Sequence, residues 1–513
     1  MPFPRTSGIL LHPTSLPSRF GVGDLGRPAY EFIDFLVESN QKLWQVLPLG
    51  PTGYGNSPYM CYSAMAGNPI LINLDLLVED GLLSYEDIGQ VPDFPSEKVD
   101  FEQVLSFKLP LLQKACQNFV QHSTENLPEE PNENFQPNWA QKLQQEFQTF
   151  CAGAIYWLND YALFMSLKAA HAGDSWHTWD LGIRHREPAA VEAWKLQLKD
   201  EIQYHNFVQF IFFRQWSALK KYANQKGIEI IGDIPIYVAA DSADVWAHPE
   251  IFCLDEETSL PSLMAGVPPD YFSSTGQLWG NPVYDWDKLE QTDFDWWIKR
   301  FEVLLDYVDI IRIDHFRGFE AYWAVKQGET TALNGEWLKA SGDEFFEVLN
   351  EKLGKLPVMA EDLGIITPEV EALRDKFELP GMKILHFAFG GNTDNPYLPF
   401  NISRNSVIYT GTHDNDTTVG WFNNLGEHEK QNLLDYLGCT SSDGIHWDLI
   451  RLAQSSVANQ AIFPLQDILG LGTEARMNYP GKAEGNWEWR YQAGALTHSV
   501  SSLLKKLTHI YGR

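Results

Sequence analysis

The chain has 513 residues, 44% of them hydrophobic, and a formal net charge of −30. This charge argues against nucleic-acid partners and against an anionic membrane surface, whereas a neutral substrate meets no such repulsion. No stretch approaches the roughly 20 apolar residues that span a membrane, and no secretion signal is evident. The five cysteines are scattered without CxxC spacing, which predicts reduced thiols, a cytoplasmic location and no zinc framework.

The N-terminal part predicts a strand at 8–12, a helix at 27–40 and a strand at 43–49, which indicates a βαβ unit and a parallel sheet. The next region, 51–223, has a mainly helical pattern and is interpreted as an insertion after the second strand. Within it we expect helices at 156–170 and 203–223, and a surface-exposed acidic, proline-rich segment at 121–137.

Alternation resumes with a strand at 228–235, followed by a second insertion, 239–300, that is expected to be loop-rich. A helix at 293–305 then leads to the fourth strand, 308–313. Further strands are predicted at 357–361, 382–387, 406–410 and 461–465. Two more helices should open at Ser341, in a capping box with Glu344, and at Thr367, with Pro368 in the first turn.

Eight strands with intervening helices predict an α/β protein of the (β/α)8 TIM-barrel type, with 1–513 as a single catalytic unit. A doubly wound open sheet is the alternative, and the count of eight weighs against it. Only about 50 residues follow the eighth strand, so no C-terminal β-sandwich is expected.

The fourth strand ends in a dense cluster of polar residues, namely Arg312, Asp314, His315 and Arg317. A single aspartate at such a place would be explained by a turn or a helix cap; four polar residues within six positions favour catalysis. Side chains at the C-terminal ends of barrel strands converge on one mouth. The residues expected there are Asp233, Arg312, Asp314, Glu361, Asp362, His413 and Asp414.

Two carboxylates on adjacent strands suit retaining glycoside transfer, in which they stand roughly 5–5.5 Å apart. Asp314 and Glu361 are on the fourth and fifth strands. Arg312 would lower the pKa of Asp314, and apolar neighbours could raise that of Glu361. His413 and Asp414 would hold sugar hydroxyls. A metal-dependent sugar enzyme is the rival hypothesis, with His315, His413, Asp314, Glu361 and Asp414 as ligands, but neither HxH nor HExxH occurs.

Several motifs resemble the 4-α-glucanotransferases known as amylomaltases or disproportionating enzymes, which are relatives of the α-amylases. The similarity covers almost the whole chain, through SGILLHPTSLPS, AGVPPDYFSSTGQLWGNP, RIDHFRG, AEDLG, GTHDND, PLQDILGLGTEARMN and GNWEWR. The RID motif with a downstream Glu and HD is shared with α-amylases in general. One departure is His386, where Gln is more usual in the family.

The resemblance implies that Asp314 is the nucleophile, Glu361 the acid/base and Asp414 the transition-state stabiliser, supported by Arg312 and His413. It implies a mobile loop, 266–273, over the acceptor side, with Asp270 pointing inward. The other implied substrate-binding residues are Tyr59, Asp233, Gln277, Trp279, His315, Phe387 and Asn478, with Tyr54 as a second glucan contact away from the active site.

By the same resemblance the substrates are α-1,4-glucans and maltooligosaccharides, with glucose as an acceptor, and long donors can cyclise. No calcium or other cofactor is implied. A hydrolytic α-amylase-type enzyme would use the same three acids and differ in how water is excluded on the acceptor side by 266–273 and Trp279. A silent glucan-binding protein is disfavoured by the complete acid set, and the choice between monomer and weak dimer stays open.

Overall fold

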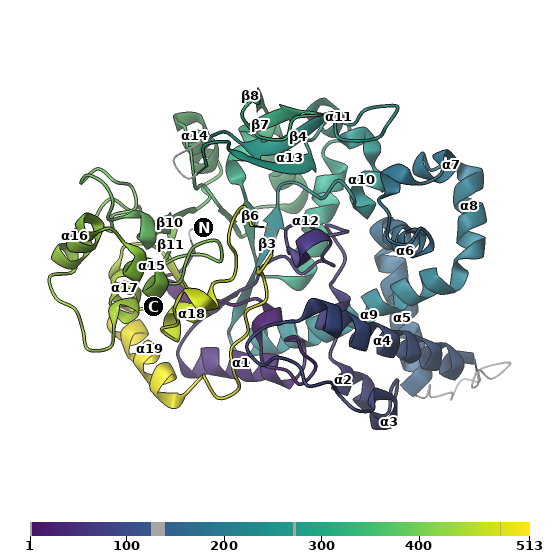
Figure 1. Cartoon of the computed structure of the whole chain (residues 1–513), viewed down its shortest axis with the longest axis horizontal. Coiled ribbons are helices and arrows are strands. Elements are labelled where there is room, and N and C mark those ends of the chain that lie inside the picture. Colours follow the sequence, from purple (N-terminus) through teal and green to yellow (C-terminus); the bar gives the residue numbers. More distant parts are fainter. Residues whose placement is uncertain (1–2, 125–138, 270–272, 483) are drawn as a thin grey trace.

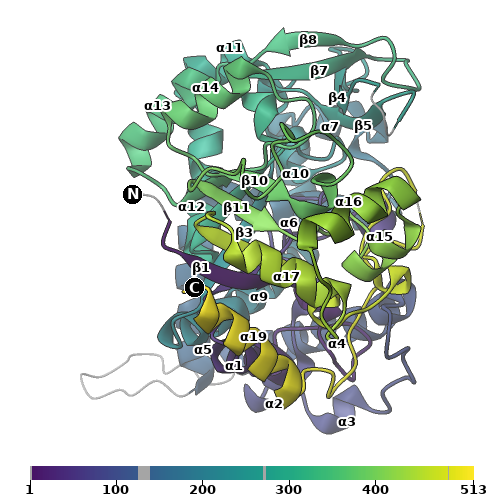
Figure 2. The same cartoon turned by 90° about the vertical axis from the view of Figure 1, so that its left-hand side faces the viewer.

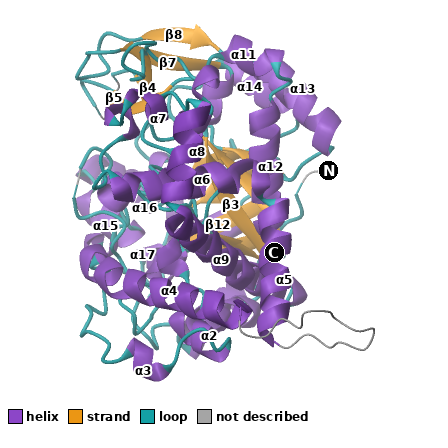
Figure 3. Ribbon diagram, turned by 90° about the vertical axis from the view of Figure 1, so that its right-hand side faces the viewer, coloured by secondary structure: helices purple, strands orange, loops and turns teal. Residues whose placement is uncertain are grey.

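The computed structural model describes residues 3–124, 139–269, 273–482 and 484–513 (Figure 1). Within these ranges eight parallel strands close into a barrel, in the order β1-β12-β11-β10-β9-β6-β3-β2. Helices surround these strands (Figure 3). The predicted TIM barrel is therefore confirmed.

The barrel strands are β1 (Thr6–Leu10), β2 (Leu43–Gln45), β3 (Glu229–Pro235), β6 (Ile310–Asp314), β9 (Val358–Ala360), β10 (Gly381–Ile384), β11 (Ser406–Tyr409) and β12 (Gln460–Pro464). Their apolar side chains are covered on both faces, as is usual for parallel strands beneath helices. All eight lie where the sequence predicted them, but six end before the predicted residue, most of all β2 and β10. β2 stops at Gln45 instead of 49, and β10 gives way to a 3-10 turn, Leu385–Phe387, in which His386 stacks on Trp421.

The region between β2 and β3 is helical, and its helices gather at the right and lower right in Figure 1. Helices α6 (Ile155–Ala170) and α9 (Lys199–Gln225) correspond to the helices predicted at 156–170 and 203–223. Helix α9 packs against both β3 and α1 (Arg27–Glu38). Most of the acidic segment predicted at 121–137 lies outside the described residues. The helices are α2 (Leu74–Glu79), α3 (Tyr85–Ile88), α4 (Phe101–Thr124), α5 (Trp139–Gly153), α6 (Ile155–Ala170), α7 (Leu181–Arg184), α8 (Pro188–Gln197) and α9 (Lys199–Gln225).

The segment 239–300 contains more regular structure than the sequence suggested. It forms α10 (Ala243–Ala247), β4 (Leu263–Val267), β5 (Gln277–Pro282), α11 (Trp286–Gln291) and the start of α12 (Asp295–Tyr307). β4 pairs antiparallel with β7 (Ala321–Lys326), which follows β6, and β7 pairs with β8 (Glu336–Lys339). The described residues thus include a second sheet, β5-β4-β7-β8, which lies above the barrel in Figures 1 and 2.

The remaining helices are α13 (Gly342–Leu353), α14 (Pro368–Lys376), α15 (Thr418–Asn424), α16 (Glu427–Leu437), α17 (Ile445–Ser455), α18 (Leu465–Ile468) and α19 (His498–Ile510). Ser341 is the N-cap of α13 as predicted, and Pro368 lies in the first turn of α14. The predicted capping box with Glu344 is wrong. Ser341 has ψ near 50° instead of the extended backbone that a capping side chain needs, and its hydroxyl makes no capping bond.

Two arginines hold the seam where β1 meets β12. Arg513 Nη1 donates to Thr6 O and to Asn459 O at 3.1 Å, and its Nε donates to Gln454 O at 2.9 Å near the end of α17. Arg5 donates to the same end of α17, at Gln454 O and Ser456 O. A helix C-terminus is a favourable place for a cation, so these guanidinium groups satisfy carbonyls at the seam.

In the described ranges, no helix combines the length and apolar character needed to cross a membrane.

Candidate active site

Asp314 and Glu361 emerge side by side at the C-terminal end of the barrel. Ile313 pairs with Ala360, and the Glu361 N–H donates to Ile313 O at 2.9 Å. Both oxygens of the Glu361 side chain accept backbone hydrogen bonds, from His315 N at 2.7 Å and from Leu363 N at 2.9 Å. The side chain of Asp314 keeps 28% of its surface exposed, so a substrate can reach it.

A sharp turn after Asp314 produces this contact. His315 has a φ of 53°, in the left-handed region that non-glycine residues seldom adopt, and this conformation directs its N–H toward Glu361. Trp279 lies edge-on to the His315 ring at 4.8 Å. Burial, and then the charge of Arg317, lowers the pKa of His315 to about 3, so the ring is neutral at pH 7.

Arg312 is shared between two carboxylates inside the barrel. Its Nη1 donates to both oxygens of Asp233, at 2.7 and 2.6 Å, and to Asp314 Oδ1 at 2.9 Å. Tyr59 donates its hydroxyl to Asp233 Oδ2 at 2.7 Å. The Asp233 side chain is fully buried, and its carboxylate accepts hydrogen bonds from Arg312 and Tyr59. Its expected contact with sugar stays a prediction.

The surroundings push the two catalytic candidates toward different protonation states. Burial raises the pKa of Asp314 to about 6, opposed by the charge of Arg312. Burial, and then the charge of Asp314, raises the pKa of Glu361 to about 8. At pH 7 Asp314 is therefore mainly ionised and Glu361 mainly protonated, as a nucleophile and a general acid require.

Asp414 completes the group of three acids. Its Oδ1 accepts from Asn478 Nδ2 at 2.6 Å, and its Oδ2 lies 3.3 Å from His413 Nε2. Burial alone would raise the pKa of Asp414, but the charge of His413 and the hydrogen bonds from His413 and Asn478 hold it below its ordinary value. The His413 ring stacks on Tyr59 at 5.2 Å, which joins this acid to the Asp233 pair.

The other predicted residues are placed less directly. Trp279 Nε1 donates to Gln277 Oε1 at 3.2 Å, and Phe387 packs edge-to-face on Tyr397 at 5.5 Å. Tyr397 was not predicted, and the charge of Glu361 contributes to raising its pKa to about 12, after burial and the charge of Asp362. Asp270 and the side chain of Tyr54 lie outside the described residues.

The expectation that Asp362 faces the mouth is wrong. Its Oδ2 pairs with Arg374 of α14 at 2.5 Å, and its Oδ1 accepts from Met382 N at 2.7 Å. Successive side chains after a strand point to opposite sides, so Glu361 facing inward turns Asp362 toward the helices.

The metal hypothesis finds no support in the residue geometry. No group of three or more His, Cys, Asp or Glu side chains in the described part of the chain is arranged to hold a metal ion. Both Glu361 oxygens already accept backbone N–H groups, and His413 Nε2 faces Asp414.

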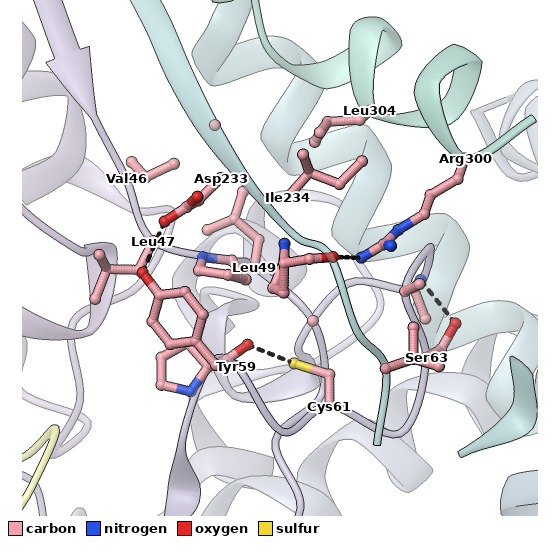
Figure 4. A pocket seen from close by; sticks show the side chains of 18 of the residues that line it. Val46, Leu47, Leu49, Tyr59, Cys61, Ser63, Asp233, Ile234, Arg300 and Leu304 are labelled. Carbon is pink, nitrogen blue, oxygen red and sulfur yellow. Dashed lines mark hydrogen bonds between the residues drawn. The ribbon is translucent and has the colours of Figure 1, made fainter. Parts of the chain in front are cut away.

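Beside Asp233 lies a cavity of about 40 Å³ (Figure 4). Its lining includes Tyr59, Asp233, Cys61, Arg300 and Tyr237. Arg300 reaches it from α12 and donates to Pro235 O at 2.7 Å. Sequence patterns gave no signal for this cavity, because its lining comes from segments that are distant in the chain.

Comparison with known proteins identifies the family. A family model described as 4-alpha-glucanotransferase (glycoside hydrolase family 77) matches residues 11–497. The 4-alpha-glucanotransferase of Synechocystis sp. is 59% identical over 511 residues, covering 99% of this chain and 98% of that protein. The Thermus thermophilus 4-alpha-glucanotransferase is 50% identical over 514 residues, covering 99% of each.

Solved structures agree. The amylomaltase from Streptococcus agalactiae, in complex with acarbose, has a TM-score of 0.92 at 40% identity and covers 99% of both chains. The amylomaltase from Corynebacterium glutamicum shares the fold at 17% identity, with a TM-score of 0.78 over 98% of this chain and 75% of that one. With the barrel, the three acids and these relatives together, the chain belongs to the 4-alpha-glucanotransferases of glycoside hydrolase family 77.

Proposed function

We propose that this 4-α-glucanotransferase moves a segment of an α-1,4-glucan by retaining double displacement at Asp314 and Glu361. Asp314 attacks the anomeric carbon while Glu361 gives its proton to the leaving glycosidic oxygen. After the leaving glucan departs, the rest of the donor stays covalently bound to Asp314 as a glycosyl-enzyme. Glu361, now ionised, takes the proton from the 4-hydroxyl of an acceptor glucan or glucose, which displaces Asp314 and restores the α configuration.

These roles are supported best by the different surroundings of the two carboxyls. Arg312 donates to Asp314, whereas burial and the charge of Asp314 raise the pKa of Glu361 above that of Asp314. Retaining enzymes need such a pair roughly 5–5.5 Å apart, and neighbouring strands β6 and β9 suit that spacing. The shared Arg312 fixes the orientation of Asp314 through the 2.9 Å bond.

Asp414 is the proposed transition-state stabiliser. Its pKa is held low, so its negative charge is available at neutral pH beside the positive charge that develops on the sugar ring. His413 and Asn478 orient it, and we propose Tyr59, Gln277, Trp279, His315 and Phe387 as sugar-contacting residues. Asp233, Asp270 and Tyr54 are proposed only on the family resemblance.

Maltooligosaccharides and longer α-1,4-glucans are the proposed donors, glucose is among the proposed acceptors, and long donors can cyclise. The relatives that support this assignment are named 4-alpha-glucanotransferases. A cytoplasmic location is proposed from the composition and the five free cysteines.

Incubation with maltotriose tests the function. Transfer should give glucose together with longer maltooligosaccharides, at a nearly constant number of reducing ends. A steady rise in reducing ends would instead identify a hydrolase, and no new products would leave only a binding role.

Two controls address the mechanism. The Asp314→Asn variant should lose almost all transfer, and an undiminished rate would refute Asp314 as nucleophile. Treatment with a chelator should leave the rate unchanged, whereas loss of activity that added metal restores would support the metal-dependent alternative.

A further inference from the structure

The chain beyond β3 is held by an unusual set of side-chain donors. The segment 235–238 follows Asp233 out of the barrel wall, and three of its carbonyls accept hydrogen bonds from side chains. Arg300 Nη2 donates to Pro235 O at 2.7 Å (Figure 4), and Tyr284 Oη donates to Ile236 O at 2.7 Å. Asn281 Nδ2 donates to Val238 O at 2.8 Å. We name Asn281, Tyr284 and Arg300 the carbonyl clamp.

All three members of the carbonyl clamp are buried, with exposed fractions of 5% for Asn281, 1% for Tyr284 and 3% for Arg300. A buried carbonyl that loses its donor bears a desolvation cost that water cannot relieve. The clamp therefore restrains the path of 235–238 more strongly than exposed hydrogen bonds would.

Packing around this segment is incomplete at the cavity. The cavity of about 40 Å³ borders Pro235, Tyr237 and Val238 on one side. A wall next to a void lacks the close contacts that elsewhere restrain a protein interior. Directional hydrogen bonds from the carbonyl clamp supply the missing restraint.

Asn281 also connects the two sides of the proposed active site. It lies on β5, the strand with Gln277 and Trp279, and its Nδ2 is 3.7 Å from the sulfur of Met60, the neighbour of Tyr59. Tyr237, within the clamped segment, packs against Trp279 with ring centroids 6.3 Å apart. One side chain thus contacts the loop after β2, the loop after β3 and the strand on the acceptor side.

We propose that Asn281 is a positioning residue that keeps Trp279 and its strand closed against the Tyr59–Asp233 side, and so favours sugar acceptors over water. In this proposal Asn281 acts through its contacts with Val238 and Met60, and not by binding the substrate. This inference rests on the proposed glucanotransferase function. A looser β5 admits water to the glycosyl-enzyme on Asp314, so the ratio of transfer to hydrolysis falls while bond cleavage continues.

The test compares Asn281→Leu, which keeps the size of the side chain and removes the donor, with Gln215→Leu. Gln215 is equally buried at 4%. Its side chain makes two hydrogen bonds with the backbone of Asn73, within the helical region between β2 and β3: Nε2 donates to Asn73 O at 3.1 Å, and Oε1 accepts from Asn73 N at 2.8 Å. The measured quantity is glucose-acceptor transfer divided by new reducing ends, with maltotriose as donor, together with the melting temperature of each variant.

Asn281→Leu should lower this ratio about fivefold to tenfold, the factor expected for one buried hydrogen bond, and raise the KM for acceptor glucose. Gln215→Leu, which loses two buried hydrogen bonds, should lower the melting temperature at least as much and leave the ratio unchanged. An unchanged ratio in folded Asn281→Leu would overturn the proposal, and so would an equal fall in both variants.

If Asn281→Leu does not fold, Tyr284→Phe tests the carbonyl clamp. It removes the 2.7 Å bond to Ile236 O and leaves that carbonyl only the longer 3.5 Å bond from Arg300 Nη1. A fall in its ratio relative to Gln215→Leu supports the carbonyl clamp, and an unchanged ratio refutes it. The wild-type enzyme in the same assay tests the proposed function separately. A wild type that only hydrolyses would refute that function before any variant is compared.

Discussion

The Glu361→Gln substitution separates the two halves of the proposed reaction. With its pKa raised to about 8, Glu361 is mainly protonated at pH 7 and can donate its proton to the leaving oxygen. The amide that replaces the carboxyl group in this variant has no such proton. A positioned general acid contributes about 10²–10⁴-fold, so transfer from maltotriose should fall by about that factor.

A donor with a fluoride leaving group, such as α-maltosyl fluoride, needs no protonation at the departing atom. With this donor, Glu361→Gln should still form the glycosyl-enzyme at a rate near that of the wild type. The second step lacks its base, so the covalent intermediate should accumulate on Asp314. Intact-protein mass spectrometry measures the adduct, and peptide mapping locates it.

The pH dependence follows from the same two groups. Asp314 acts when ionised, so kcat/KM should rise as the pH increases through about 6. Glu361 acts when protonated, so kcat/KM should fall again as the pH passes about 8. With the fluoride donor, the pH profile of kcat/KM for Glu361→Gln should keep its rise near pH 6 and lose its fall near pH 8. An adduct on another residue, or an alkaline limb that persists, would refute the assignment.

Three further predictions concern neighbouring contacts. Tyr59→Phe removes the 2.7 Å hydrogen bond to Asp233 and should lower kcat/KM on maltotriose about tenfold; an unchanged value would show that this bond does not support Arg312. Asn478→Ala removes a donor to Asp414 and should raise its pKa toward the ordinary aspartate range. Because that range still lies below pH 5, the fall in rate should be the same from pH 5 to 8, and a loss confined to acidic pH would contradict this. Arg513→Ala should lower stability by about 3 kcal/mol, or the melting temperature by about 3 °C for a chain of this length, with kcat unchanged. Calorimetry should show less than about 0.5 kcal/mol for the exposed Arg27→Ala, and equal effects of the two would argue against the seam contacts.

The barrel was predictable because each of its strands is a short apolar run between helices, and burial on both faces leaves that pattern in the sequence. The three acids were predictable for a related reason. Asp314 ends β6, Glu361 follows β9 directly, and Asp414 lies in the short loop after β11, and the fold brings strand ends together at one mouth. Local sequence therefore determined both the elements and the candidate residues.

The second sheet left no comparable signal. β4 and β5 contain Gly266 and Gly280, lack clear alternation and pair across a bulge. β4 finds its other partner, β7, only after the chain has passed through β6, and such a distant pairing has no short-range pattern. The contact of Tyr59 with the fully buried Asp233 joins residues 174 positions apart and was equally invisible as a pair. The capping box at Ser341 failed because backbone geometry, which the motif does not encode, excluded it.

Because β4 pairs with β7, the strand that carries Asp314 lies, along the chain, between the two halves of the second sheet. The chain leaves that sheet after β5, passes through β6 in the barrel wall and returns to it as β7. The second sheet is thus connected at both ends to the strand that carries Asp314, the proposed nucleophile. Transplanting this sheet onto another barrel would require both connecting loops together, because either hairpin alone would lack the partner strand that completes the β4–β7 ladder.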